Sequence, residues 1–305
     1  MISFIIPTYK NDKSLIKCVE EIGKIVTSLN LEYEIIVVDN FLTNQYVAKL
    51  SVFHDLSLKI FKNPVLGAHN SRRLGLYNSK GDIIVFVDDD NYLTSDYVVF
   101  ILSTLESKIS SNFFIGCATK EFTNVDWKNN NYDPFTYACG SLEGQNFKNN
   151  IPVYWGAGMA MNRELAFNIF KKDLVVEGRM DKKKYIMSGE DHEYSLRAFF
   201  LKAQFKYYPK IGLYHDFDIN RLNDDYYKKA QIGFSYAAYL LKNYYEIHSK
   251  SKFYANVFSG FLYNLLFAIG YNLKHSLQFT GWLILNDSLS FSKFKKRFIA
   301  VNDFI

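Results

Sequence analysis

Four short apolar runs, separated by stretches of helical character, occupy the first third of the chain. Each run is dominated by β-branched and aromatic residues, which is typical of a strand buried on both faces. Alternation of strand and helix requires a parallel sheet with right-handed crossover connections. The sequence therefore predicts an α/β fold with a mostly parallel sheet flanked by helices. The four predicted strands are Ile2–Ile6, Glu34–Val38, Leu58–Phe61 and Ile83–Val87.

The helices between these runs are indicated by apolar spacing and by capping residues. Lys13 to Leu29 carries one apolar stripe, and Asn11 or Asp12 can cap its start. Further helices are predicted over Gly67–Asn78 and from Ser95 to about Lys108. Later in the chain we expect a long loop over Asn124–Asn150 that is a candidate substrate lid, helices over Arg163–Lys171 and Asp191–Lys202, and strands over Phe205–Tyr208 and just before Tyr214.

Polar residues follow each of the four predicted strands. Pro7, Thr8 and Tyr9 follow the first strand, and Asp39 and Asn40 follow the second. Ligands of open parallel sheets bind beyond the carboxyl ends of the strands. We therefore expect these residues, with Asn63 after the third strand and the run Asp88-Asp89-Asp90-Asn91 after the fourth, to line one ligand-binding edge.

The three consecutive acids, Asp88 to Asp90, are the strongest chemical signal. Adjacent carboxylates at a strand end repel one another unless a cation compensates them. Mg²⁺ and Mn²⁺ prefer carboxylate and phosphate oxygen ligands. A solvated acidic turn is the structural alternative, and the buried strand before the acids makes it the weaker one.

Four other positions each have a functional and a structural interpretation. Asp39 can accept hydrogen bonds from a nucleoside or form a turn. Arg72 or Arg73 can reach a diphosphate or lie on the surface. Glu190 and Asp191 open a helix, where a carboxylate is either a cap or a general base. His215 is a metal ligand or a structural histidine.

Taken in order, these motifs resemble family 2 glycosyltransferases with the GT-A fold, a Rossmann-like architecture. The resemblance covers Ile2 to Arg221. It rests on Ile-Ile-Pro-Thr-Tyr at the start, Ile-Val-Val-Asp39, Asn63 to Gly75, Gly81-Asp82 and the three acids. It continues with Trp155-Gly156-Ala157-Gly158-Met159, Gly189-Glu190-Asp191 and His215. Asn40-Phe41-Leu42 and the pair Arg72-Arg73 depart from the family pattern and leave the donor base open.

The resemblance implies a role for each matching residue. Asp191 would be the catalytic base, with Glu190 shaping the site beside it. Asp90, Asp88 and His215 would hold Mn²⁺ or Mg²⁺, with Asp88 nearer the ribose. Acceptor contacts would come from Trp155, Gly156 and Met159. The nucleotide-sugar contacts would be Pro7, Thr8, Tyr9, Asp39, Asn63, Arg72, Asp88 and Asp89, with Asp39 reading uracil if the donor is a UDP-sugar.

The chain changes character after residue 220. Residues 221–305 carry 11 Lys and Arg against 5 Asp and Glu, so the net charge of +5 belongs to this tail and does not indicate nucleic-acid binding. Tyr226–Tyr245 is predicted helical. The uncharged stretch Val257–Leu273, with basic residues on both sides, suits peripheral contact with an anionic membrane. Packing on the catalytic domain or a homodimer interface is the alternative.

These features predict the domain organisation and the location. We expect a catalytic domain over 1–220, with a nucleotide-binding half (1–118) and an acceptor-binding half (119–220), and a helical, basic and aromatic region over 221–305. No secretory signal opens the sequence, and the three cysteines have no paired spacing. We therefore expect a cytoplasmic protein at the inner face of the plasma membrane.

The implied reaction is inverting transfer of a hexosyl or N-acetylhexosaminyl group from a nucleotide-sugar to an acceptor hydroxyl. The acceptor would be a glycan or lipid-linked glycan of bacterial capsule, O-antigen or exopolysaccharide synthesis. The alternatives are a nucleotidyltransferase acting on sugar phosphates and an inactive glycan-binding scaffold. A nicotinamide-dependent oxidoreductase is disfavoured because no Gly-x-Gly-x-x-Gly follows the first strand.

Overall fold

A computed structural model describes residues 1–42, 45–106, 112–127, 131–147, 151–176, 180–182 and 185–246. By its internal contacts the chain divides into two compact units, Met1–Phe234 and Ser235–Ile305. The expected division at residues 220 and 221 stays a prediction. The uncharged stretch Val257–Leu273 and its basic flanks lie outside the described residues.

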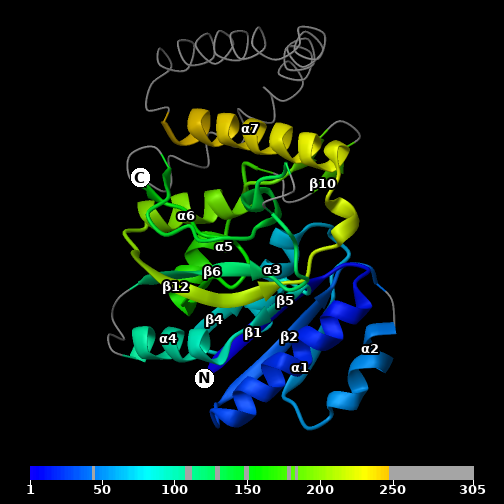
Figure 1. The fold of residues 1–305 in the computed structure, drawn as a ribbon. Coiled ribbons are helices and arrows are strands. Elements are labelled where there is room, and N and C mark those ends of the chain that lie inside the picture. The colour runs from blue at the N-terminus through cyan, green and yellow to red at the C-terminus, as the bar shows by residue number, and fades with distance from the viewer. Residues whose placement is uncertain are drawn as a thin grey trace, which may run out of the picture. The chain divides into compact units, whose positions relative to one another are not determined.

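The first unit is built on an eight-stranded sheet in the order β3-β2-β1-β4-β9-β6-β12-β5 (Figure 1). Strands β3, β2, β1 and β4 are parallel, which confirms the predicted α/β fold and all four predicted strands. Their bounds are β1 Ile2–Thr8, β2 Tyr33–Asp39, β3 Leu58–Lys62 and β4 Ile83–Phe86. The prediction that β3 is buried on both faces is wrong, because β3 is the edge strand and its residues are only half-buried.

Helices cover both faces of this sheet (Figure 1). On one face α1 (Asp12–Ser28) and α4 (Ser95–Glu106) pack against Phe4 and Ile6 of β1. On the other face α3 (Ala68–Asn78), α5 (Arg163–Phe170) and α6 (Glu190–Phe200) share a second core with Ile5. Successive residues of β1 thus enter opposite cores, as strand geometry requires.

The second half of the sheet is mixed. Strand β9 (Ala160–Asn162) lies between β4 and β6 (Phe113–Glu121) and is antiparallel to both. The two strands predicted between Phe205 and Tyr214 form one strand, β12 (Gln204–His215), which is irregular near Pro209. Proline has no N–H for the ladder, so a register shift there is expected. Strand β5 (Asn91–Leu93) pairs antiparallel with the end of β12.

The remaining described elements are short, with one exception. Asp224–Glu246 forms the 23-residue helix α7, in agreement with the predicted helix over Tyr226–Tyr245. None of the described helices combines the length and the apolar character of a membrane span. The short elements are α2 Gln45–Leu50, η1 Ser51–Phe53, η2 Pro134–Tyr137, β7 Asn146–Phe147, β8 Ile151–Pro152, β10 Met180–Lys182, β11 Tyr185–Met187 and η4 Ile219–Arg221.

The expected lid, Asn124–Asn150, is described over residues 124–127 and 131–147, and its second part is hydrogen-bonded to β6 and β12. Thr119 hydrogen-bonds to the carbonyls of Ala138 and Gly140, and Tyr207 accepts a bond from the backbone of Leu142. In this structure the segment lies against β6 and β12, and its role as a lid stays a prediction.

Candidate active site at the carboxyl edge of the sheet

The strand ends meet at one edge because β1, β2, β3 and β4 are parallel and adjacent. Thr8 pairs in register with Asp39, and Asp39 with Lys62. Asn40, which was expected at this edge and which departs from the family pattern, joins two loops here. Its side-chain amide donates to the carbonyls of Asn63 and Val65, and its Oδ1 accepts from Gly67 and Ser71.

Arg72 lies at the centre of the charged site. Its side chain is 3% exposed, its Nη2 donates to Asp88 Oδ1 at 2.6 Å, and its Nη1 lies 3.4 Å from Glu190 Oε1. Burial alone would lower the pKa of Arg72, but the charges of Asp88 and Glu190 raise it overall. The guanidinium is therefore a permanent cation that joins the end of β4 to the start of α6.

Arg73, its sequence neighbour, has a different environment. Its Nη1 pairs with Asp173 at 2.8 Å, and both side chains are substantially exposed. The pair of arginines thus separates into one residue within the site and one at the surface.

Asp89, the middle acid, points toward β1 and α1. Its carboxylate accepts from Thr8 Oγ1 at 2.6 Å and from Asn11 Nδ2 at 3.1 Å. Burial and the neighbouring charges of Asp90 and Asp88 raise the pKa of Asp89 to about 7, although the two hydrogen bonds oppose the shift. Asn11 occupies the N-cap position of α1, one of the two positions expected, but its side chain contacts Asp89 and makes no capping hydrogen bond.

Asp90 faces His215. The imidazole Nε2 lies 3.5 Å from Asp90 Oδ2, and Nδ1 lies 2.8 Å from the carbonyl oxygen of Tyr137. A carbonyl only accepts, so Nδ1 must carry the proton, and in the neutral ring Nε2 presents a lone pair to the carboxylate. Two electron-rich atoms face each other in this way when a proton or a metal ion lies between them.

The possible metal ligands at this edge suit a hard divalent ion that keeps several exchangeable ligands. Asp90 and His215 supply one oxygen and one nitrogen, and Asp88 precedes Asp90 by two residues. Within the described residues, no three His, Cys, Asp or Glu side chains already form a metal cage. An ion here would take its remaining ligands from phosphate and water, as Mg²⁺ usually does.

The expected base and acceptor residues come together from two elements. Asp191 lies in the first turn of α6 and is 21% exposed. A Cβ on Gly156 would lie 3.4 Å from Asp191 Cβ and 3.6 Å from Arg72 Nη2, so this glycine permits their close approach. Met159 differs from expectation. Its side chain is fully buried in the core shared by α3, α5 and α6, so it supports the site and has no surface for an acceptor.

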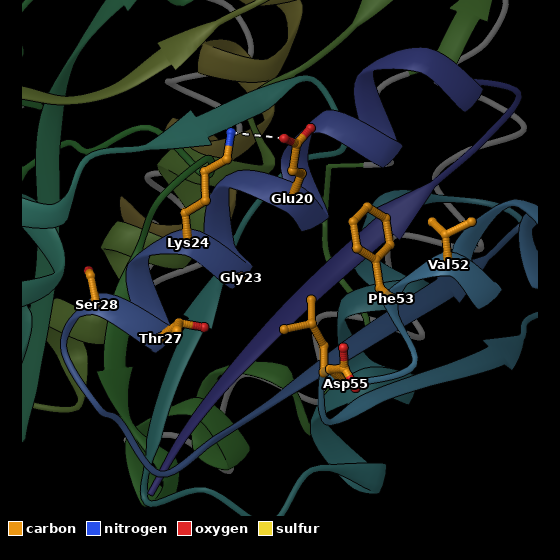
Figure 2. Close-up of a pocket in the computed structure, with 9 residues that line it drawn as sticks. Glu20, Gly23, Lys24, Thr27, Ser28, Val52, Phe53 and Asp55 are labelled. Atoms are coloured by element: carbon orange, nitrogen blue, oxygen red, sulfur yellow. Dashed lines mark ion pairs between the residues drawn. The ribbon is translucent and has the colours of Figure 1, made fainter.

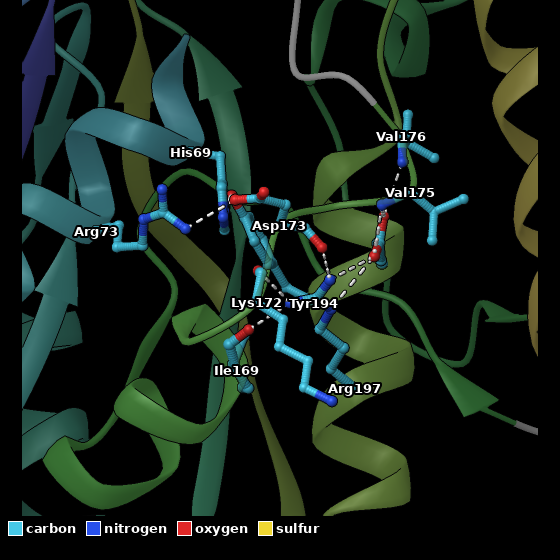
Figure 3. A network of polar contacts seen from close by, with 10 residues as sticks. His69, Arg73, Ile169, Lys172, Asp173, Val175, Val176, Tyr194 and Arg197 are labelled. Carbon is cyan, nitrogen blue, oxygen red and sulfur yellow. Dashed lines mark hydrogen bonds and ion pairs between the residues drawn. The ribbon is translucent and has the colours of Figure 1, made fainter. Parts of the chain in front are cut away.

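A buried network that sequence reasoning missed fixes the position of α6 (Figure 3). Glu193 accepts from the backbone amides of Val175 and Val176, and it pairs with Arg197 at 2.8 Å. Arg197 also donates to the carbonyls of Ile169, Lys172 and Asp173. The spacing of Glu193 and Arg197, one helical turn apart, was the signal that could have revealed it.

Seven buried side-chain polar atoms have no hydrogen-bond partner among the described residues. They are Oη of Tyr46, Nε2 of His69, Nε of Arg72, Oδ1 of Asn91, Nε1 of Trp127, Nε1 of Trp155 and Oγ of Ser188. Most buried polar atoms in proteins are hydrogen-bonded, so a group of exceptions requires an explanation. Arg72 and Asn91 contact the acids at this edge, so a polar ligand there would supply partners for Arg72 Nε and Asn91 Oδ1.

The residues expected in the nucleoside pocket separate into exposed and internal ones. Tyr9 is 53% exposed and packs edge-on against Phe41, with Lys10 Nζ beside both rings. Pro7 and Asn63 are buried. The Oδ1 of Asp39 accepts from the amides of Phe41 and Leu42, which is the turn-forming role considered as its alternative.

A groove of about 480 Å³ lies elsewhere, along the last turns of α1 (Figure 2). Its walls include Lys24, paired with Glu20, and Phe53 from η1. Asn11, at the opposite end of α1, is the residue that contacts Asp89. The groove contains none of the expected site residues and is separate from the acidic edge.

Comparison with known proteins places this geometry in a family. Residues 3–170 match the sequence profile described as "Glycosyl transferase family 2". An uncharacterized glycosyltransferase of Haemophilus influenzae is 27% identical over 146 residues, which are 48% of this chain and 45% of that protein. Glycosyltransferase AglE of Haloferax volcanii is 23% identical over 201 residues, 65% of this chain and 60% of that one.

Solved structures agree in fold. A crystal structure of S. aureus TarS 1-349 is similar with a TM-score of 0.52 and 16% identity, covering 70% of this chain and 60% of that one. The same TarS segment in complex with UDP-GlcNAc gives a TM-score of 0.50 at 15% identity, covering 71% and 58%. The chain thus spans about half to three fifths of the length of these proteins. Because the family profile covers more than half of the sequence, the chain belongs to glycosyl transferase family 2.

Proposed function

We propose that the chain is an inverting glycosyltransferase that moves a sugar from a nucleoside diphosphate donor to an acceptor hydroxyl. The observation that carries the proposal is the convergence of three kinds of group at one sheet edge. These are the acids Asp88 and Asp90, the buried cation Arg72 and the carboxylate Asp191. Gly156 lies close to both Arg72 and Asp191, so the proposed phosphate-binding and proton-accepting groups would be neighbours.

The donor diphosphate would bind beside the end of β4, next to the Asp88–Arg72 pair. Asp90 and His215, with Asp88, would hold Mn²⁺ or Mg²⁺, which when bound neutralises charge on the departing diphosphate. Arg72 is fixed by two carboxylates and keeps its own charge next to the same phosphates. Preorganised positive charge of this kind needs no rearrangement as the leaving group forms.

Asp191 would accept the acceptor proton. As the acceptor oxygen forms its bond to the anomeric carbon, the bond from that carbon to the diphosphate oxygen breaks. The diphosphate departs with the electron pair, and the proton passes to Asp191. A single in-line displacement inverts the anomeric centre. Glu190 shapes this side through its contact with Arg72.

The finer assignments are proposals of the same kind. We infer a UDP-sugar donor of the hexose or N-acetylhexosamine class, since the similar TarS structure holds UDP-GlcNAc. Tyr9 and Asp39 would contact the nucleoside. The acceptor would be a glycan or lipid-linked glycan of a bacterial surface polysaccharide, used at the cytoplasmic face of the membrane.

The test is a panel of nucleotide-sugars with Mn²⁺, read by slow donor hydrolysis and by transfer. Asp191→Asn should abolish transfer while donor binding and melting temperature stay as in the parent chain. Asp96→Asn is the matched control, because Asp96 occupies the same helical position at the start of α4 and should be neutral. Normal turnover by Asp191→Asn would exclude Asp191 as the base. Detection of nucleotidyl transfer to a sugar phosphate would show that the chain is a nucleotidyltransferase instead.

A further inference from the structure

The backbone that carries Asp90 and His215 is held by neighbouring strands. His215 pairs with Asn91 across β12 and β5, and the backbone amide of Asp216 donates to the Asp90 carbonyl at 2.7 Å. The imidazole is oriented by the bond from its Nδ1 to the Tyr137 carbonyl. These contacts do not orient the Asp90 carboxylate, because the terminal torsion of an aspartate side chain is broad.

The side chain of Asn91 contacts that carboxylate. Its Nδ2 donates to Asp90 Oδ1 at 2.9 Å, while Asp90 Oδ2 lies 3.5 Å from His215 Nε2. A carboxylate only accepts hydrogen bonds, so the amide must present its NH₂ group to Asp90. The carboxylate therefore has one oxygen on Asn91 and the other toward the histidine.

Folding alone would not favour an asparagine at position 91. Asn91 is 2% exposed, and its Oδ1 is buried without a hydrogen-bond partner among the described residues. A buried acceptor without a donor is unfavourable, and asparagine is depleted in strands. An apolar residue would suit β5 better on both counts. The donation to Asp90 is the contact that gives an asparagine an advantage here.

The amide also differs from the group that holds the neighbouring acid. Asp88 is paired with the cation Arg72 at 2.6 Å, whereas Asp90 receives its bond from a neutral donor. A neutral donor orients a carboxylate without cancelling its charge. Asp90 thus keeps the negative charge that a divalent ion requires.

Carboxylates that bind metal ions are commonly oriented by a hydrogen bond from an outer residue. We propose that Asn91 is such a positioning residue. By holding Oδ1 of Asp90, it directs Oδ2 of Asp90 and Nε2 of His215 at one divalent ion. The inference rests on the proposed function, in which these two side chains hold the ion.

Direct binding of Mn²⁺ tests this role. The full chain is titrated with Mn²⁺ alone, well below its melting temperature, and free Mn²⁺ is measured by its electron paramagnetic resonance signal. Asn91→Ala should raise the Kd for Mn²⁺ at least about tenfold, as removal of an outer partner of a metal ligand does.

Asn162→Ala is the matched control for a buried-strand asparagine. Asn162 lies in β9 opposite Ile83, at the start of β4, and its Oδ1 accepts from the Phe113 amide at 2.8 Å. Its loss should lower the melting temperature, because a backbone amide loses its partner, and should leave the Kd for Mn²⁺ as in the parent chain.

A second variant separates positioning from a structural effect. Asn91→Leu removes the donor, fills the same space and removes the unpaired acceptor, so without metal it should be more stable than Asn91→Ala. Both variants should still lose Mn²⁺ affinity to a similar extent. A Kd that follows stability, or a parent-like Kd in either variant, would overturn the positioning role.

This inference and the proposed function fail in different ways. Transfer by the parent chain together with a parent-like Kd in Asn91→Ala would support the glycosyltransferase and reject the role of Asn91. Loss of Mn²⁺ affinity in both variants, with no nucleotide-sugar hydrolysed or transferred by the parent, would support the role of Asn91 and reject the proposed reaction. A parent chain that binds no Mn²⁺ would reject the inference.

Discussion

Asp88 and Asp90 lie two residues apart at the end of β4, yet the chain balances their charges differently. Asp88 faces Arg72, a permanent cation held at 2.6 Å. Asp90 faces His215, whose ring is positive only when protonated. One half of the acidic edge therefore has a fixed positive charge, and the other half has an exchangeable one. The fixed half joins the end of β4 to the start of α6 through Arg72. We expect the exchangeable half to respond to the metal ion.

The largest expected effect comes from breaking the fixed half. Arg72→Met leaves Asp88 and Glu190 without their shared cation. Removal of one member of a fully buried ion pair costs roughly 3 to 5 kcal/mol of stability, and this is an upper bound here because the Asp88 side chain is 33% exposed. Donor binding should be lost as well. Urea unfolding measures the first effect and calorimetry the second.

Arg73→Met is the natural control for this experiment. Its pair with Asp173 is solvent-exposed, and such pairs contribute about 0 to 1 kcal/mol. Equal destabilisation by the two substitutions would contradict the distinction between a site arginine and a surface arginine.

The exchangeable half should respond to metal. With Mn²⁺ at a hundredfold excess over its Kd, the parent chain should gain about 2.7 kcal/mol of stability. His215→Asn should lose this gain while its amide still donates to the Tyr137 carbonyl, so its metal-free stability should stay near that of the parent. Asp90→Asn should lose the gain too. Thermal unfolding with Mn²⁺ and with EDTA measures both, and Asp82→Asn, at an exposed acid, should respond as the parent does.

How far the sequence could predict this difference between Asp88 and Asp90 depends on whether the groups around them are side chains or backbone atoms. Asp88, Asp90 and Arg72 belong to recognisable sequence motifs. Their proximity follows from the parallel sheet, whose strands could be predicted from the apolar runs. The partner of His215 Nδ1 is a backbone carbonyl, that of Tyr137, and a carbonyl has no sequence signature. The sequence motifs therefore identified the candidate site residues, but not the orientation of their side chains.

Other parts of the fold could not be predicted for the same reason, which is that they leave no local pattern in the sequence. Strand β9 has three residues, too few to show a period of two, yet it separates β4 from β6 and creates the mixed half of the sheet. Asn40 was expected at the ligand-binding edge, but its structural role there was not predicted. Its four hydrogen bonds to the Asn63–Ser71 segment depend on a neighbouring strand, which local pattern does not reveal.

The fixed charge of Arg72 also acts on a buried histidine, His69. It stacks on Phe170 and lies 3.1 Å from the Tyr194 hydroxyl, and burial together with Arg197, Arg73 and Arg72 lowers its pKa to about 3. A histidine kept neutral in the folded state, with an unfolded pKa near 6.5, contributes stability at high pH that is lost as the pH falls below about 6.5.

The expected loss is about 2 kcal/mol between pH 8 and pH 5. His69→Phe should reduce this part of the pH dependence, which denaturant unfolding at several pH values measures. His54→Phe, at an exposed histidine, should leave the dependence unchanged. An unchanged slope in His69→Phe would mean that His69 titrates normally in the folded chain.

The smallest effect concerns Asp89, the acid between the two halves. Asn11 precedes α1, where sequence rules treat Asn and Asp as equally good caps. In the structure its amide instead donates to Asp89 Oδ1 at 3.1 Å. Asn11→Asp would replace this donor with a second carboxylate, so we expect a loss of about 1 kcal/mol at neutral pH, where the cap rule predicts none. Because the loss arises from repulsion, it should shrink at low pH or when a divalent ion binds nearby. A neutral or stabilising Asn11→Asp, measured by urea unfolding, would show that Asn11 acts through the helix and that Thr8 alone supports Asp89.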